Sequence, residues 1–333
     1  MTHTPEAPAL RLGTRRSKLA MAQSGLVAEQ VRRVTGRPVE LVEITTYGDT
    51  SREHLAQIGG TGVFVAALRE ALLRGEIDFA VHSLKDLPTA PHDDLLIAAI
   101  PPRADARDVL IARDGLDFEQ LVRSSRTAGK AATVGTGSPR RMAQLNAWAL
   151  SLGGRVETVP IRGNIDTRIG YVRSGELDAV VLAAAGMERT GRLDEVTELL
   201  SPDAVLPAPG QGALAVECAS ANAYLAVQLA ELDDPSTRAA VTAERTLLAA
   251  LEAGCSAPVG ALADLRGDGQ AVTEMRLRGV VGTTDGETLV QLSTTGPVPA
   301  SDDGTTVPQN MGRELADEML AKGAAGLMGE RAL

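Results

Sequence analysis

Two stretches of this chain, one hundred residues apart, repeat the same junction between a helix and a strand. Residues 74–81 read Arg-Gly-Glu-Ile-Asp-Phe-Ala-Val, and residues 174–181 read Ser-Gly-Glu-Leu-Asp-Ala-Val-Val. In each, a glycine that can end a helix precedes an acid and then an apolar run of strand length. Strands that alternate with helices in this way favour α/β units on a largely parallel sheet.

A second pair of stretches repeats in the same order along the chain. In residues 12–17 and in residues 134–141, the end of a predicted strand is followed by Gly-Thr, by Ser and by the arginine-containing start of a predicted helix. The two repeats together predict two similar α/β domains that face each other. The alternative is that both patterns are common punctuation of α/β proteins.

The chain has 333 residues, which is enough for two or three domains of ordinary size. Proline-rich stretches at 101–103 and 206–210 are candidate crossings between domains. We predict a first domain at 1–103 with 205–223, a second domain at 104–204 and a third domain at 224–333. Expected elements are strands at 10–13, 39–46, 77–83 and 212–218, helices at 17–36, 63–74 and 239–251, and a loop or hairpin at 297–306.

Composition excludes several classes of partner. The formal net charge is -10 and the aromatic fraction is 2%, so neither a nucleic acid nor an anionic membrane surface is an expected partner. Residues 1–10 contain no apolar signal segment, and no later run reaches the ~18 apolar residues of a membrane span. We expect a cytoplasmic protein.

Arginines collect on the loops that join the predicted strands to helices. Amides and hydroxyls at a helix start favour an anion, and arginine adds paired hydrogen bonds to carboxylates or phosphates. Each arginine alone is as well explained as a solvated surface charge. Together they predict a positive cleft for a ligand with several carboxylates, formed by loops at 14–17, 136–141 and 161–168 and by Arg189. No Gly-rich phosphate motif indicates a nucleotide.

Two further residues are candidates for chemistry. Asp86 follows a predicted buried strand, where α/β proteins bind ligands, and it is either a general acid/base or a turn cap. Cys255 lies on a turn flanked by Gly254 and Pro258, and it is either a nucleophile or a buried space-filler. With only two cysteines and no Cys/His cluster, neither a disulfide framework nor a metal site is expected.

Motifs along nearly the whole chain resemble the hydroxymethylbilane synthase family, also called porphobilinogen deaminases. The run His82-Ser83-Leu84-Lys85-Asp86-Leu87-Pro88 and the run Arg162-Gly163-Asn164 are specific in combination. The other matching motifs, in order, are 15–20 with Gln23, 59–64, 135–141, 167–168, 182–186 with Arg189, 206–212, and Glu244-Arg245 ahead of Cys255.

The resemblance implies an α/β fold with two domains like those of periplasmic binding proteins and a smaller α/β (α+β) C-terminal domain. It implies a transferase of haem and tetrapyrrole biosynthesis. Four porphobilinogen molecules would be joined head to tail, with loss of ammonia, and water would release the linear hydroxymethylbilane. One dipyrromethane cofactor per chain would be held by a thioether to Cys255, and the enzyme would be monomeric.

The resemblance also implies roles for individual residues. Asp86 would be the catalytic acid that assists ammonia loss and stabilises the cationic intermediates, while Gln23 would lie nearby and Phe64 on a lid. Carboxylates of cofactor and substrate would be bound by Arg15, Ser17, Lys85, Thr136, Ser138, Arg140, Arg141, Arg162, Arg168 and Arg189. Two positions depart from many relatives: Thr61 replaces a lid lysine, and Lys18 replaces a proline at a helix start.

Two other functions fit parts of the pattern. A non-catalytic solute- or effector-binding protein would share the two-domain fold, but it needs neither Cys255 nor Asp86. A thiol-dependent hydrolase would pair Cys255 with a histidine, and none of His3, His54, His82 and His92 has an evident triad context.

Overall fold

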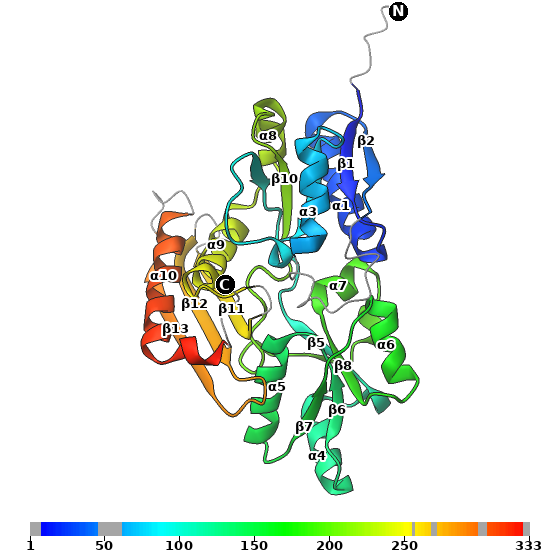
Figure 1. Cartoon of the computed structure of the whole chain (residues 1–333), viewed down its shortest axis with the longest axis vertical. Helices are drawn as coiled ribbons and strands as arrows, with labels where there is room; N and C mark the ends of the chain where they lie inside the picture. Colours follow the sequence, from blue (N-terminus) through cyan, green and yellow to red (C-terminus); the bar gives the residue numbers. More distant parts are fainter. Residues whose placement is uncertain (1–7, 46–61, 255–256, 268–271, 299–304, 329–333) are drawn as a thin grey trace, which may run out of the picture. The chain divides into compact units, whose positions relative to one another are not determined.

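The computed structural model describes residues 8–45, 62–254, 257–267, 272–298 and 305–328 of the chain (Figure 1). The chain divides into two compact units, of which the first contains residues 1–103 and 213–237 and the second contains residues 104–212 and 238–333. The finer division into three domains, with boundaries after 103, 204 and 223, stays a prediction.

A five-stranded mixed sheet with the order β2-β1-β3-β10-β4 forms the centre of the first unit. Its first three strands are parallel, and β10 runs antiparallel to both of its neighbours. Helices α1 and α8 cover one face and α3 covers the other, each through an apolar cluster. The elements are β1 (Leu10–Thr14), α1 (Lys18–Thr35), β2 (Val39–Glu43), α3 (Gly62–Leu73), β3 (Phe79–Ser83), β4 (Leu95–Ala99), β10 (Leu214–Ala219) and α8 (Ala223–Ala230).

The second unit contains a sheet of the same design, with the order β7-β6-β8-β5-β9. Here β6 is parallel to β7 and β8, and β5 is antiparallel to β8 and β9. Helices α4 and α5 pack on one face, and α6 and α7 pack on the other. The elements are β5 (Asp108–Ala112), α4 (Phe118–Ala128), β6 (Ala132–Gly135), α5 (Pro139–Ser151), β7 (Val156–Val159), α6 (Ile165–Arg173), β8 (Ala179–Ala183), α7 (Ala184–Arg189) and β9 (Glu198–Leu199).

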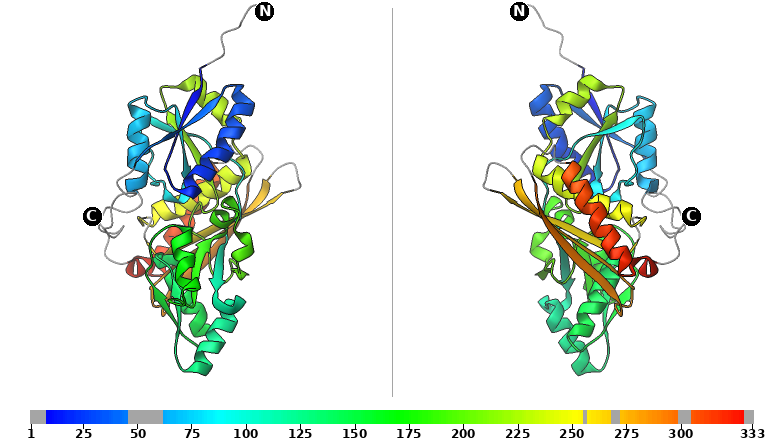
Figure 2. Two further views of the ribbon diagram at one scale, coloured as in Figure 1. Left: turned by 90° about the vertical axis from the view of Figure 1, so that its right-hand side faces the viewer. Right: turned by 90° about the vertical axis from the view of Figure 1, so that its left-hand side faces the viewer.

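The C-terminal region forms a three-stranded antiparallel sheet in the order β11-β12-β13. Helix α10 lies along this sheet, and its apolar side joins that of α9 in one core around Leu247, Met275 and Leu315 (Figure 2). The elements are α9 (Pro235–Ala250), β11 (Val259–Gly267), β12 (Val272–Gly282), β13 (Leu289–Pro297) and α10 (Thr306–Ala321). Two five-stranded α/β sheets and this smaller region confirm the predicted fold class.

The internal repeat is present at the level of individual hydrogen bonds. In the first sheet, Asp78 N donates to Arg11 O at 2.8 Å, and Asp78 Oδ2 accepts from Arg11 N at 2.7 Å. In the second sheet, Asp178 N donates to Thr133 O at 3.0 Å, and Asp178 Oδ2 accepts from Thr133 N at 2.8 Å. The acid of each repeated motif therefore joins two neighbouring parallel strands at their beginning.

Two glycines of the repeat serve the same packing purpose. A Cβ on Gly13 would lie 2.3 Å from Ile77 Cδ1, and a Cβ on Gly135 would lie 2.6 Å from Leu177 Cδ1. Real Cβ atoms do not approach other atoms so closely, so the apolar residue of each motif fills the space that its glycine leaves. The repeat thus reflects two domains of the same design.

Most element predictions are confirmed, with shifts that have physical causes. The helix predicted from Ser17 to Gly36 is capped by the Ser17 hydroxyl and ends at Gly36 with φ 65. The helix predicted from 239 begins earlier, at Pro235, because Asp234 accepts a hydrogen bond from Thr237 N at 2.7 Å. The predicted loop at 297–306 has its ends in β13 and α10, and residues 299–304 lie outside the described residues.

Within the second unit, helix α5 also contacts the C-terminal sheet. The turn between β12 and β13 approaches α5 so closely that a Cβ on Gly286 would lie 2.2 Å from Ala147 N. Gly286 has φ 75, which also favours glycine. Asn146 Nδ2 donates to Thr284 O in the same turn at 2.7 Å. The helix that begins with Arg140 and Arg141 is therefore held by the C-terminal region as well.

Candidate active site

The loop after β1 and the first turn of α1 form one part of the candidate site, in the first unit. The Ser17 hydroxyl accepts a hydrogen bond from Ala20 N at 3.2 Å, while Arg15 is half-buried. Gln23, further along α1, is buried and donates from Nε2 to Ser83 Oγ at the end of β3, at 3.1 Å. The start of α1 and the carboxyl end of β3 therefore lie together.

Asp86 lies directly after this end of β3, in a short 3₁₀ turn, η1 (Leu84–Asp86). Leu84 and Leu87 are fully buried, and Leu84 N donates to Ala213 O at 3.0 Å. The turn is therefore anchored on both sides of Asp86, which is half-buried together with Lys85. No described residue donates a hydrogen bond to the Asp86 carboxylate, so the turn-cap explanation has no support among these residues.

The corresponding loop of the second unit leads from β6 into α5. Thr136 is fully buried, and its Oγ1 accepts from Ser138 N at 3.2 Å. Pro139 occupies the first turn of the helix, and the Ser138 hydroxyl does not cap it. A Cβ on Gly137 would lie 2.8 Å from Ile161 O, so this loop packs against the loop that carries Arg162.

Arg140 and Arg141 are almost completely buried, and both bind the Asp108 carboxylate. Arg140 Nη1 lies 2.7 Å from Asp108 Oδ2, and Arg141 Nη2 lies 2.7 Å from Oδ1. Arg140 Nη1 also donates to Leu206 O at 2.6 Å, and Arg141 Nη1 donates to Val181 O at 2.9 Å. Burial alone would raise the pKa of Asp108, but the two arginine charges lower the pKa far below its usual range. Asp108 is therefore a permanent buried anion.

The segment 206–212 is tied to the same cluster. Gln211 Nε2 donates to Asp108 Oδ1 at 2.8 Å, and Gly212 O accepts from Arg189 Nη2 at 2.6 Å. Glu244 of α9, which is fully buried, accepts from Gly210 N at 2.7 Å and from Ala263 N at 2.9 Å. One loop thus connects the arginine cluster to the C-terminal region.

Arg168 and Arg189 are half-buried arginines of the second unit. Arg168 Nε donates to Gly163 O at 2.9 Å, and burial together with the nearby Arg141 charge lowers the pKa of Arg168 to about 10. Burial also lowers the pKa of Arg189. Among the described residues, neither guanidinium forms an ion pair with a carboxylate. The nearby Glu188 charge partly offsets the effect of burial on the pKa of Arg189. A half-buried arginine that forms no ion pair suits an anionic ligand.

The structure assembles the predicted site residues in two groups. The first unit contains Arg15, Ser17, Gln23, Lys85 and Asp86. The second unit contains Thr136, Ser138, Arg140, Arg141, Arg162, Arg168 and Arg189. Cys255 lies outside the described residues. Phe64 lies in the first turn of α3, and its side chain is not described.

Sequence reasoning missed Asp108, Gln211 and Glu244. Asp108 begins the apolar strand β5, and an acid at the start of an apolar run is a detectable signal for a buried charge that needs a partner. Gln211 and Glu244 occur inside the recognised motifs, but nothing in the local sequence indicates that their side chains bridge distant segments.

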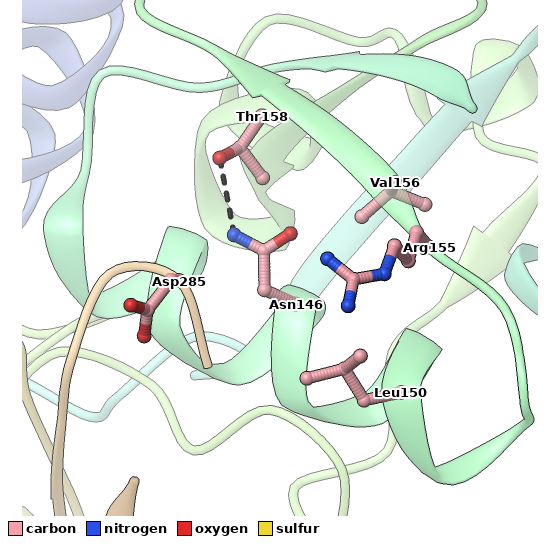
Figure 3. Close-up of a pocket in the computed structure, with 6 residues that line it drawn as sticks. All are labelled: Asn146, Leu150, Arg155, Val156, Thr158 and Asp285. Atoms are coloured by element: carbon pink, nitrogen blue, oxygen red, sulfur yellow. Dashed lines mark hydrogen bonds between the residues drawn. The ribbon is translucent and has the colours of Figure 1, made fainter. Parts of the chain in front are cut away.

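A shallow pocket of about 190 Å³ lies away from these residues, between α5, β7 and the turn that contains Asp285 (Figure 3). Asn146 Nδ2 donates to Thr158 Oγ1 there at 3.2 Å. None of the predicted site residues lines this pocket. Within the described residues, no group of His, Cys, Asp and Glu side chains could hold a metal ion, and no helix is long and apolar enough to cross a membrane.

Two α/β domains of one design, with arginines and hydroxyls on the loops after their strands, define a two-domain α/β protein whose loops suit an anionic ligand. The chain resembles a solved ligand-binding component of an ABC-type import system from Staphylococcus aureus, with TM-score 0.40 and 12% identity over 72% of this chain and 73% of that chain. It also resembles the VFT2 domain of Bordetella pertussis BvgS, with TM-score 0.40 and 15% identity over 68% of this chain and 87% of that chain.

The chain belongs to the porphobilinogen deaminase family. Residues 10–226 match the family model for the porphobilinogen deaminase dipyromethane cofactor binding domain, and residues 238–321 match that for the C-terminal domain. Porphobilinogen deaminase 1 of Streptomyces avermitilis is 78% identical over 97% of this chain and 98% of its own length. The porphobilinogen deaminase of Thermobifida fusca is 54% identical over 97% of this chain and 96% of its own length. That of Mycobacterium tuberculosis is 49% identical over 96% of this chain and 98% of its own length. The chain is accordingly an enzyme, a transferase of tetrapyrrole synthesis with a dipyrromethane cofactor domain, and the non-catalytic alternative is set aside.

Proposed function

We propose that the two groups of residues divide the work of a hydroxymethylbilane synthase between them. The second-unit arginines bind the acetate and propionate groups of the dipyrromethane and of the growing chain. In the first unit, Asp86 performs the proton chemistry on porphobilinogen, while Arg15, Ser17 and Lys85 bind side-chain carboxylates of cofactor and substrate. The observation that carries this proposal is the half-buried Arg168 beside Arg141, because a cation that forms no ion pair among the described residues is stabilised by a bound carboxylate.

The described residues fit the dipyrromethane. When bound, this group supplies the pyrrole end to which porphobilinogen units are added. Arg141, Arg168 and Arg189 offer charge-assisted hydrogen bonds to its carboxylates, and Thr136 and Ser138 add hydroxyl and amide donors at the start of α5. Cys255, outside the described residues, would hold it through a thioether at Sγ.

Asp86 is suited to act on the leaving amine and on the positive charge that follows. Its carboxylate is held on an anchored turn at the end of β3, and no described residue donates a hydrogen bond to it. In the proposed role, one of its carboxylate oxygens accepts a proton and later returns it. Its negative charge stabilises a cation that develops on a pyrrole during ammonia loss.

The choice of Cys255 over Cys218 rests on thiol chemistry. Cys218 is fully buried in β10, and burial raises the pKa of its thiol to about 11. A thiol of that pKa supplies little thiolate near neutral pH, and the thiolate is the nucleophile. Cys218 is therefore inert, and Cys255 remains as the attachment residue.

Intact-protein mass tests the attachment directly. The purified chain should carry an adduct of dipyrrole mass, and peptide mapping should locate it on the peptide that contains Cys255. The Cys218→Ala variant, a matched control, should retain the adduct, while Cys255→Ser should lose it. An adduct on the Cys218 peptide, or none on the unaltered protein, would refute the proposed attachment.

We further propose that the enzyme is a cytoplasmic monomer that binds porphobilinogen and no nucleic acid. The net charge of -10 supports the absence of a nucleic-acid partner. Light scattering behind size-exclusion chromatography checks the monomer, which should elute at the chain mass of 34.7 kDa.

A further inference from the structure

We propose that Asp108 is a positioning residue for carboxylate binding: it acts through Arg140 and Arg141 and fixes where their guanidinium groups point. This inference rests on the proposed function, and it adds to the proposed carboxylate-binding site a residue that does not itself touch the ligand. Asp108 itself is fully buried beneath the two arginines.

The geometry of the cluster leaves the arginines little freedom. The two oxygens of Asp108 are shared out, with Oδ2 at 2.7 Å from Arg140 and Oδ1 at 2.7 Å from Arg141. A backbone carbonyl accepts from each arginine as well, Leu206 O at 2.6 Å and Val181 O at 2.9 Å. Arg140 is thus held by two acceptors on its Nη1, and Arg141 by one acceptor on each terminal nitrogen. Fixed guanidinium groups favour a preorganised carboxylate site.

Gln211 fixes the carboxylate in turn. Its Nε2 donates to Asp108 Oδ1 at 2.8 Å and to Ala106 O at 2.8 Å, while Gln144 Nε2 donates to Leu206 O at 3.0 Å. The two glutamines therefore link Asp108 and the backbone acceptor of Arg140 into one network. Arg140 Nε and Arg141 Nε, in contrast, are buried without a hydrogen-bond partner among the described residues, so each arginine keeps one donor that the network does not use.

The charges of the cluster favour an anionic ligand even though Asp108 is present. Two arginines, Arg140 and Arg141, share the single negative charge of Asp108, and the Arg168 charge lies close enough to Arg141 to be affected by it, so the net charge of the four residues is positive. Asp108 offsets enough charge for Arg140 and Arg141 to be buried side by side. The charge of Arg168 and part of the charge of Arg141 are left to attract the carboxylates of a ligand.

Asp108→Asn removes the charge and keeps the shape. We expect the fraction of purified protein that carries the dipyrrole, measured by intact mass, to fall at least about fivefold. In the fraction that is loaded, KM for porphobilinogen should rise about tenfold while kcat changes by less than about threefold, because misplaced arginines weaken binding of substrate and transition state alike.

Asp178→Asn is the matched control. Asp178 also binds an arginine, because Arg113 Nε lies 2.6 Å from its Oδ1. It lies just before β8, whereas Arg141 contacts that strand further along, at Val181. We expect its loading and KM to stay within about twofold of the unaltered protein even where its melting temperature falls. Equal losses of loading in the two variants would mean that Asp108 serves stability alone.

Two more variants keep the inference testable if Asp108→Asn does not fold. Asp108→Glu retains the charge and should recover part of the loading that Asn loses, although its extra methylene costs packing. Gln211→Met removes the hydrogen bond to Asp108 and should raise KM in the same direction, by less. An unaltered protein without dipyrrole would overturn the proposed function, whereas normal loading and KM in folded Asp108→Asn, or in Gln211→Met, would overturn the role of Asp108 only.

Discussion

Arg69 and Glu217 form a two-pronged ion pair inside the first unit. Arg69 Nη2 lies 2.8 Å from Glu217 Oε1, and Arg69 Nε lies 3.2 Å from each carboxylate oxygen. His82 Nε2 lies 3.1 Å from Glu217 Oε2 on the other side, close enough for an ion pair but without hydrogen-bond alignment. Helix α3 is thereby tied to β10, and β10 is paired with the strand that leads to Asp86.

Replacement of Arg69 by leucine should destabilise the protein strongly. The Glu217 carboxylate would be left buried and poorly compensated, which costs about 3–5 kcal/mol in comparable cases. Urea denaturation measures this loss. The control is Arg74→Leu, which removes exposed pairs with Glu70 and Glu76 and should change the free energy of unfolding far less than Arg69→Leu. Similar losses in both variants would contradict the prediction.

Replacement of Gly13 by alanine should destabilise the fold, and a second substitution at Ile77 should restore much of the lost stability. The new Cβ would meet Ile77 Cδ1 at 2.3 Å, and overpacking of this kind costs about 1–3 kcal/mol. Ile77→Val deletes the clashing methyl group, so the double variant should recover much of the loss in thermal unfolding. Gly25→Ala in α1, where nothing lies within 4 Å, should stabilise by about 0.5–1 kcal/mol. Purely additive effects of Gly13→Ala and Ile77→Val would disprove the contact.

The free energy of unfolding should fall as pH drops below about 5. Burial alone would raise the pKa values of Asp178 and Glu217, but hydrogen bonds from Thr133 and Arg113 lower the pKa of Asp178, and the neighbouring His82 and Arg69 lower the pKa of Glu217. A carboxyl whose native pKa lies below its unfolded value of about 4 stabilises the fold above that pH and loses the effect as pH falls toward the native pKa. Denaturation at a series of pH values measures the slope. Asp178→Asn should flatten it more than the same change at exposed Asp93, and an unchanged slope would count against this account.

Replacement of Asp86 by asparagine should separate catalysis from binding. The variant keeps the size of the side chain but cannot hold a proton or offset a cation. It should still acquire dipyrrole and bind porphobilinogen, while single-turnover ammonia release falls by ~10²–10⁴-fold. Asp86→Glu should retain more activity than Asp86→Asn. Near-normal ammonia release from the loaded asparagine variant would remove Asp86 from the mechanism.

Much of the fold could be predicted because its signals are local. The repeated Gly-Glu-Ile/Leu-Asp motifs determine a helix end, a strand start and a strand-bridging acid, and all three recur in both sheets. The cap at Ser17 and the stop at Gly36 are of the same kind. Such features depend on neighbouring residues and backbone geometry, so they are visible in the sequence.

The parts of the site that were missed depend on contacts between distant residues. Asp108 meets Arg140 and Gln211 at separations of 32 and 103 residues along the chain, and Glu244 meets Gly210 at 34. No periodicity or spacing carries such information. The same holds for burial: Arg140 and Arg141 look like ligand-binding arginines in sequence, whereas in the fold their principal partner is an internal carboxylate.

The position of β10 has a consequence for synthesis on the ribosome. This strand lies between β3 and β4, yet it follows all of residues 104–212 in the chain. Until it emerges, the nascent first sheet consists of two pieces with unpaired edges facing a gap. At ~5–20 residues per second, that interval lasts roughly ten seconds, ample time for the second sheet to form first. Exposed sheet edges pair readily with other chains, so aggregation of the nascent chain is favoured during this interval.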